Sequence, residues 1–157
     1  KPLGLINPIG KTTYTRIKSL GFKTYQRIID ITSSEIAWIQ IGTQNDKKLN
    51  GLTSDFRGRS LVFLLKIISS SDIVLGDEGL INHLASSFPW VKSFVAYSEF
   101  SPKKYYSYKN TRVVGFYNSN NLVNLNWQED IPKGYQLPKI EERAKKISDE
   151  ILSQVKL

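Results

Sequence analysis

Short apolar segments recur along the first 117 residues, and stretches with helical periodicity separate them. These segments are apolar throughout rather than alternating in polarity, which is typical of parallel strands covered by helices on both faces. The pattern therefore predicts an α/β fold, a Rossmann-like doubly wound parallel sheet. The predicted strands are Leu3–Ile6, Glu35–Gly42, Asp72–Gly76, Val91–Tyr97 and Thr111–Tyr117, and the predicted helices are Phe22–Ile31, Ser60–Ser71 and Gly79–Phe88.

The remaining segments divide the chain further. Residues 43–59 are polar and marked by glycine, which predicts a loop. We expect residues 1–117 to form the Rossmann-like domain, residues 118–138 to be an irregular polar tract, and residues 139–157 to be an amphipathic helix that packs on the same domain. The apolar face of that helix would carry Ile140, Ala144, Ile147, Ile151 and Val155.

Composition limits the chemistry. The chain has no cysteine and one histidine, which argues against a disulfide framework, thiolate chemistry and a structural zinc site. There is no clear Asp-x-Asp metal motif either, and we expect neither a metal nor an organic cofactor. The formal charge of +8 favours anionic partners, although ordinary solvation of the surface would also explain it. Because methionine is absent even at position 1, we expect the chain to begin inside a longer gene product or to have been trimmed.

The segment VLGDEGLINHL holds a candidate anion-binding turn. Gly76 and Gly79 allow the backbone to bend sharply, and the N–H groups at the start of the next helix would point toward an anion such as a diphosphate. His83 lies one helical turn beyond Gly79, so its ring could reach the same place. A plainer interpretation stays open, in which Asp77 or Glu78 caps the helix and His83 is a partly buried side chain.

The span from Leu3 to Val114 resembles the C-terminal half of heptosyltransferase-type glycosyltransferases, the family that includes ADP-heptose:lipopolysaccharide transferases. In that family a strand ends in a Gly-Asp-Thr-Gly-like turn, which is followed by a histidine, Leu-Ala and a P-x-V strand. The corresponding stretches here are KSLGFKTYQRIID, IQIG, RSLVFLLKIISSSDIVLGDEGLINHLASSFPWVKSFVAYSEFSP and YKNTRVV. The resemblance implies one half of a GT-B enzyme, whose C-terminal Rossmann-like domain holds most of the nucleotide-sugar donor.

The resemblance also implies donor-binding residues. The backbone amides of the matching turn are expected to receive the donor diphosphate; the matching residues are Gly76, Asp77, Gly79 and Leu80. Lys18 resembles the lysine of the family's Lys-x-Trp-Pro segment, which would neutralise phosphate charge. Asp46 is the nearest candidate for an acid that the family often places against the ribose. Lys103 lies in a loop that borders the donor site in the family.

Three departures from the family pattern stand out. Glu78 occupies a position where a small hydroxyl residue is common. Asn82 stands in the customary place of the histidine, and His83 follows one position later. Tryptophan and proline are missing after Lys18. These changes leave the identity of the donor and the activity itself open.

The segment Phe100–Arg112 interleaves basic residues with Tyr105, Tyr106 and Tyr108, a mixture that can stack bases and track phosphates of a single strand. The alternative is an ordinary loop with tyrosines packed inward and lysines in water. In the family, Lys103 and Lys104 would meet donor phosphate here, so we do not expect nucleic acid as a partner.

The expected function is donor binding in a glycosyltransferase that moves a heptose-like sugar or a hexose from a nucleoside-diphosphate sugar to a saccharide or lipid-linked saccharide acceptor. A sugar hydroxyl would attack the anomeric carbon while Lys18, the helix N-terminus and His83 stabilise the departing diphosphate. The general base would lie in a missing N-terminal domain, so the sequence assigns no catalytic residue and the chain alone should not turn over. The alternative is a degenerate domain retained as a binding or scaffold module. The resemblance implies a cytoplasmic location, either free or peripheral at the inner face of the membrane.

Overall fold

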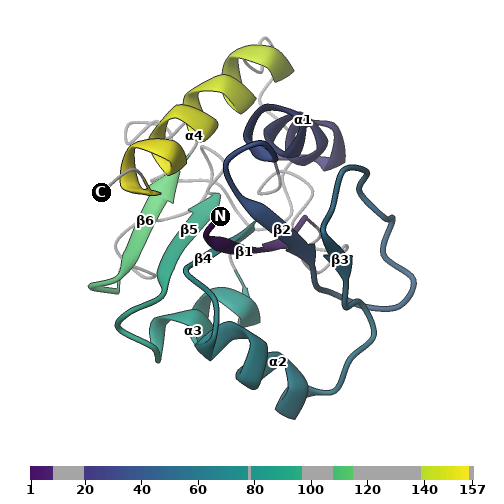
Figure 1. Ribbon diagram of the computed structural model, residues 1–157, viewed down its shortest axis with the longest axis vertical. Helices are drawn as coiled ribbons and strands as arrows, with labels where there is room; N and C mark the ends of the chain where they lie inside the picture. The colour runs from purple at the N-terminus through teal and green to yellow at the C-terminus, as the bar shows by residue number, and fades with distance from the viewer. Residues whose placement is uncertain (9–19, 78, 97–107, 115–138, 156–157) are drawn as a thin grey trace, which may run out of the picture.

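The computed structural model describes residues 1–8, 20–77, 79–96, 108–114 and 139–155. In this part of the chain, six parallel strands form one sheet in the order β3-β2-β1-β4-β5-β6. Helices α1 and α4 lie on one face of the sheet, and α2 and α3 lie on the other (Figure 1). The predicted fold class, a doubly wound α/β sheet, is confirmed.

The strands are β1 (Leu3–Asn7), β2 (Ala37–Gln40), β3 (Ser54–Asp55), β4 (Ile73–Asp77), β5 (Lys92–Ala96) and β6 (Thr111–Val114). The helices are α1 (Phe22–Thr32), α2 (Leu61–Ser69), α3 (Leu80–Ser86) and α4 (Ile140–Val155). Ser60 caps α2 as predicted, because its side chain accepts a hydrogen bond from the Phe63 N–H. The predicted irregular tract, 118–138, lies outside the described residues.

Strand β3 was not predicted, because its sequence is polar and lies within the expected loop. It pairs in parallel with β2 at the edge of the sheet, where Ser54 lies opposite Ile39 and Asp55 opposite Gln40. An edge strand pairs with only one neighbour and does not need apolar residues on both of its faces. A search for apolar segments therefore does not detect it.

Residues of the central strands alternate between two cores. Leu5 and Val74 face the α2 and α3 side, whereas Ile6 and Leu75 face the α1 and α4 side. The second side also receives Ala144, Ile147 and Ile151 of α4, all fully buried. This burial of α4 against the sheet explains the apolar stripe in an otherwise charged helix.

Trp38 anchors the larger core. Its ring is fully buried, and its Nε1–H donates to Thr32 Oγ1 at 2.8 Å. The Thr32 hydroxyl in turn donates to the Ile28 carbonyl at 2.7 Å. The end of α1 thus satisfies the one polar atom of this indole inside the core.

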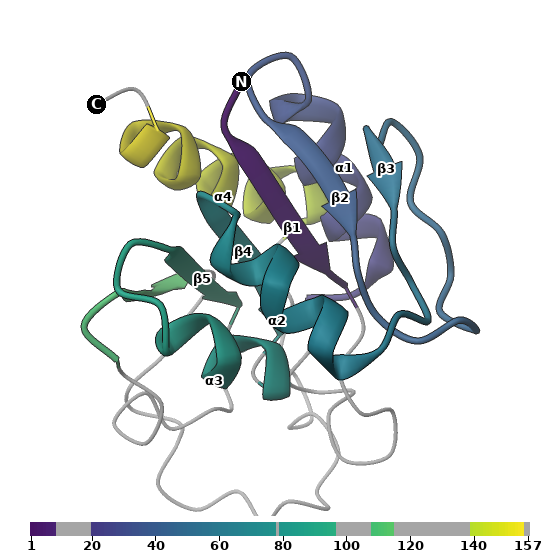
Figure 2. The ribbon, with the colours of Figure 1, turned by 60° about the horizontal axis from the view of Figure 1, so that its bottom comes forward.

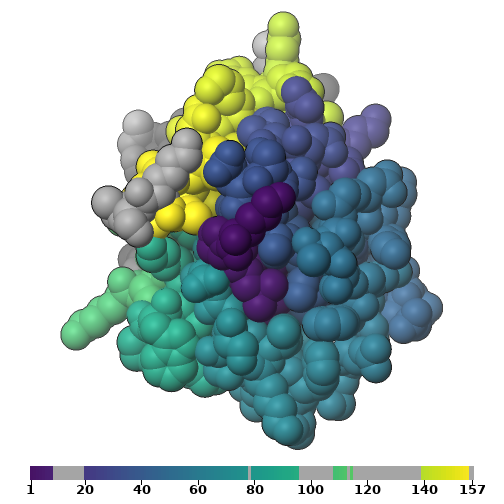
Figure 3. Space-filling model, in the orientation of Figure 1, coloured from purple at the N-terminus to yellow at the C-terminus, as the bar shows by residue number. Residues whose placement is uncertain are grey.

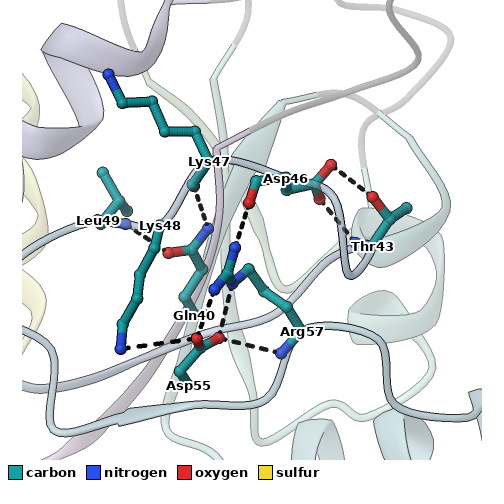
Figure 4. A network of polar contacts seen from close by, with 8 residues as sticks. All are labelled: Gln40, Thr43, Asp46, Lys47, Lys48, Leu49, Asp55 and Arg57. Atoms are coloured by element: carbon teal, nitrogen blue, oxygen red, sulfur yellow. Dashed lines mark hydrogen bonds and ion pairs between the residues drawn. The ribbon is translucent and has the colours of Figure 1, made fainter.

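A polar network shapes the connection from β2 to α2 (Figure 4). The Arg57 guanidinium donates to both carboxylate oxygens of Asp55, at 2.9 and 2.7 Å, and also to the Asp46 carbonyl oxygen. Gln40, at the end of β2, donates to the Lys47 carbonyl and accepts from the Leu49 N–H. These bonds order a loop that the sequence presents only as polar.

Among the described residues, every helix is too short or too polar to cross a lipid bilayer.

We predict that Thr32→Val lowers the free energy of unfolding by about 1–3 kcal/mol more than Thr24→Val, measured by urea denaturation. Both threonines are buried in α1 and donate to a carbonyl four residues earlier. Only Thr32 also accepts from Trp38, so only its loss leaves a buried indole N–H unpaired. Equal effects of the two variants would contradict this role.

A second prediction concerns pH. The hydrogen bonds from Arg57 lower the pKa of Asp55 to about 2. Since this value lies below that of the unfolded chain, roughly 3.9, the pair stabilises the fold above about pH 4 and loses its effect as the pH falls toward about 2. Asp55→Asn should therefore cost about 1–2 kcal/mol at neutral pH, and the cost should shrink across that acid window.

Lys48→Ala is the control for that measurement. Its Nζ lies 3.8 Å from Asp55 Oδ2, but its side chain is 59% exposed, so its removal should cost less than about 0.5 kcal/mol. An Asp55→Asn effect that is independent of pH would show that the carboxylate charge is not what stabilises this loop.

Candidate functional site

The strand order reverses between β1 and β4. From β1 the chain builds the sheet outward through β2 to β3, and it then returns to the other side of β1 and continues from β4 to β6. In open α/β sheets of this kind, ligands bind beyond the carboxyl ends of the strands at the point of reversal. Asn7 of β1 and Gly76 of β4 lie opposite each other at this point.

Gly76 allows an unusually close approach of the two strand ends. A Cβ at this position would lie 3.0 Å from the Asn7 carbonyl oxygen and 3.3 Å from Asn7 Cβ. A larger residue would therefore push the strands apart. The Asn7 side-chain oxygen is buried, and no described residue forms a hydrogen bond with it. It is the kind of polar atom that a ligand or an ordered water satisfies.

Asp77, the last residue of β4, faces the α1 layer. The Tyr25 hydroxyl donates to its Oδ1 at 2.5 Å, and both residues are buried. The pKa of Tyr25 is raised well above its ordinary value. Burial is the largest cause, and the charge of Asp77 and this hydrogen bond add to it. Tyr25 therefore stays protonated and holds the carboxylate of Asp77 toward α1.

Asp46 belongs to the loop after β2, on the other side of β1 from Gly76. Its carboxylate accepts the Thr43 N–H at 2.7 Å and the Thr43 hydroxyl at 2.6 Å. Gly42 has a φ of 141°, and a Cβ there would overlap Asp46 Oδ2 and lie 3.3 Å from Asn7 Oδ1. The oxygens of Asp46 and Asn7 thus converge on one glycine at the carboxyl edge of the sheet.

Gly79 is the N-cap of α3, and no side chain caps this helix within the part of the chain that the structure describes. The plainer interpretation names Asp77 or Glu78 as the cap; Asp77 is held by Tyr25 on its Oδ1, and Glu78 lies outside the described residues. A Cβ on Gly79 would meet no atom within 4 Å, and its backbone is extended. Leu80, the first residue of α3, is 61% exposed. The turn after β4 is therefore open at these two positions.

Asn82 and His83 have different surroundings. Asn82 is buried and accepts a hydrogen bond from Ser93 on β5 at 3.0 Å, while its Nδ2 has no partner among the described residues. His83 is half-buried and lies with its Nδ1 2.7 Å from the Tyr108 hydroxyl, ring edge to face. Successive residues of a helix point about 100° apart, so the two side chains leave α3 on different sides.

Of the predicted site residues, Gly76 and Asp46 both lie close to Asn7 at the end of β1, and Asp77 and Gly79 follow Gly76 in sequence. Predicted residues Lys18, Glu78 and Lys103 lie outside the described residues, as do Lys104, Tyr105 and Tyr106. Within the described residues, no cluster of three or more histidines, aspartates and glutamates could hold a metal ion.

Sequence reasoning missed Asn7 and Tyr25. Asn7 precedes Pro8 at the end of an apolar strand, which is the position that a strand-end ligand group occupies, but the segment NPIG suggested only a turn. Tyr25 falls at helical spacing with Ile28 and Ile29, which indicates only a core residue, and its partner Asp77 is 52 residues away. Together these residues supply hydrogen-bond acceptors suited to hydroxyl groups and a neutral phenol that fixes a carboxylate.

Comparison with solved structures supports the same architecture. The chain superposes on the E. coli ADP-heptose lps heptosyltransferase II with a TM-score of 0.70 and 12% sequence identity. The match covers 98% of this chain and 46% of the heptosyltransferase, so the chain spans about half the length of that protein. No protein-family model and no curated protein sequence matches the chain. The likeness at this level of identity shows a shared Rossmann-like fold.

Proposed function

We propose that this chain is the donor-binding part of a glycosyltransferase that takes a sugar from a nucleoside-diphosphate sugar and passes it to a saccharide acceptor. The fold shared with a heptosyltransferase and the family-like turn from Gly76 to Leu80 both support the proposal. The other half of such an enzyme would supply the acceptor site and the general base.

The observation that carries the proposal is the reversal of strand order between β1 and β4. A Cβ at position 76 would press on the Asn7 carbonyl oxygen at 3.0 Å, and an unsatisfied buried oxygen of Asn7 lies beside the two strand ends. A site with this geometry is suited to a flat, polar ligand laid across the carboxyl edge, as nucleotides are in doubly wound sheets.

Each group then receives a role in the proposal. Asn7 and Asp46 present oxygens that could accept ribose hydroxyl protons. The turn at Gly76–Leu80 would hold the diphosphate, and Lys18 and Lys103 would balance its charge. In the reaction, an acceptor hydroxyl attacks the anomeric carbon while the nucleoside diphosphate leaves, so groups that stabilise the departing charge lower the barrier.

A second candidate function is a binding module without catalytic activity. The observation that favours it is the position of Asn82, which stands where the family has its histidine and is buried against Ser93. His83 instead meets Tyr108 at the surface. Under this alternative the fold would persist while the contribution of the histidine to the donor site is lost.

We predict that Gly79→Val abolishes nucleoside-diphosphate binding and leaves the fold intact. The variant's side chain would enter open space, so folding should tolerate it, but its branched Cβ would block close approach of a ligand to the turn. Calorimetric titration of ADP, GDP and UDP against the wild-type chain and the variant measures binding, and urea unfolding measures stability.

Gly76→Ala is the contrasting variant for this experiment. Its Cβ would press on the Asn7 backbone, so it should lower the free energy of unfolding by about 1–3 kcal/mol. If the wild-type chain binds none of the three nucleotides, the donor-site proposal is wrong. Binding that Gly79→Val leaves unchanged would move the diphosphate away from this turn.

A further prediction addresses the charge of Asp77. Because Tyr25 holds this carboxylate toward α1, Asp77→Asn should change nucleoside-diphosphate affinity by less than about twofold. Tyr25→Phe removes the hydroxyl that fixes the carboxylate, and it should weaken binding and cost about 1–3 kcal/mol of stability. A roughly tenfold tightening by Asp77→Asn would instead show that the carboxylate faces and repels the phosphates.

A further inference from the structure

The dipeptide Asn-Gly occurs once in the sequence, at Asn50–Gly51. It lies in the connection from β2 to β3, and both of its residues are exposed. In Figure 2 this connection forms the right-hand edge of the molecule, and in Figure 3 its blue atoms lie at the surface on the same side. Water therefore has access to this dipeptide.

The side chain of Asn50 and the backbone nitrogen of Gly51 are both free to react. Within the described part of the chain, the carboxamide of Asn50 forms no hydrogen bond, and the N–H of Gly51 donates none. Glycine also has no side chain that would shield its nitrogen. The nitrogen can therefore approach the carboxamide carbon of Asn50 without first breaking a hydrogen bond.

The fold favours glycine directly after Asn50. Gly51 has a φ of 75°, which lies in the left-handed region that residues with a side chain rarely adopt. A Cβ at this position would also lie 3.4 Å from Ile29 Cγ2 of α1. The turn that the chain makes here therefore places the least shielded backbone nitrogen beside an asparagine.

Gln26 of α1 restrains the backbone of Asn50. Its Oε1 accepts the Asn50 N–H at 2.9 Å, and its Nε2 donates to the Asn50 carbonyl oxygen at 3.3 Å. The second bond limits rotation of the peptide plane between Asn50 and Gly51, the plane that must turn before the Gly51 nitrogen meets the carboxamide. This bond is longer than a usual N–H···O bond, so the restraint that it adds is weak.

We infer that Asn50 is a site of spontaneous deamidation, whose rate the contact with Gln26 limits. The Gly51 nitrogen gives its proton to water and bonds to the carboxamide carbon of Asn50. The bond from that carbon to the side-chain nitrogen breaks, and this nitrogen takes a proton from water and leaves as ammonia. The product is a succinimide ring. Water then adds to either of its two carbonyl carbons, and the ring opens to aspartate or isoaspartate.

The modification changes both the charge and the backbone of the connection. Either product adds a carboxylate, and isoaspartate also adds a methylene group to the main chain at position 50. The preceding residue, Leu49, is buried and its N–H is held by Gln40, so the longer backbone cannot keep both bonds to Gln26. The isoaspartyl protein should therefore unfold at a lower urea concentration than the unmodified protein. The inference is independent of the proposed donor site.

Incubation of the folded chain in mildly alkaline buffer, followed by peptide mapping with mass spectrometry, tests the inference. The peptide that contains Asn50 should gain the mass difference between a carboxyl group and an amide, and it should separate chromatographically into aspartyl and isoaspartyl forms. Asn45 is the internal control, because it is also exposed in this connection. The next residue is Asp46, whose side chain shields its nitrogen and whose N–H donates to the Thr43 carbonyl at 3.1 Å. Asn45 should react at least about tenfold more slowly than Asn50.

Two variants of α1 test the restraint. Gln26→Leu removes both bonds to the Asn50 backbone and should speed deamidation at least about twofold. Lys23→Leu is the matched control: it places the same residue at an exposed position of the same helix, has no bond to Asn50 to remove, and should change the rate by less than about 1.5-fold. Urea unfolding of each variant verifies the fold. An Asn50 peptide that keeps its mass, equal rates at Asn45 and Asn50, a product without isoaspartate, or equal rates in the two variants would each overturn the inference.

Discussion

The close contact between the ends of β1 and β4 is the constraint on which the rest of the site depends. At Gly76 even a Cβ would press on the Asn7 carbonyl oxygen at 3.0 Å, so a side chain there would force the two strand ends to shift. This contact fixes the register of two strands that belong to the two halves of the sheet. It also brings the loop after β2 and the turn after β4 to the carboxyl edge of the sheet, so that residues far apart in sequence lie around the end of β1.

Much of the fold could be predicted because it rests on apolar patterning. The central strands are buried on both faces, and their runs of leucine, isoleucine and valine indicate this directly. Strand β3 gave no such signal, because a short edge pairing and the Arg57–Asp55 ion pair define it instead. The local sequence therefore predicts which segments are buried, but it does not predict the pairing of a short polar strand at the edge of the sheet.

The candidate site was predictable only in part, for a related reason. Glycines at a strand end and an acid after β2 are visible in the sequence, and the structure brings them to the same edge. The orientation of Asp77 depends on Tyr25, and the burial of the unsatisfied Asn7 oxygen depends on the neighbouring residues of the strand ends. Both are tertiary contacts, so periodicity and motif spacing hold no information about them.

The brevity of β3 has a consequence for the behaviour of the chain in concentrated solution. The outer rim of an open sheet is a template on which another chain can extend the hydrogen-bonding ladder, and this is a route to aggregation. At this rim the structure offers only Ser54 and Asp55, followed closely by the charged Arg57. An incoming strand would find few rungs and would have to desolvate an ion pair, so this side of the sheet is protected against intermolecular β-pairing.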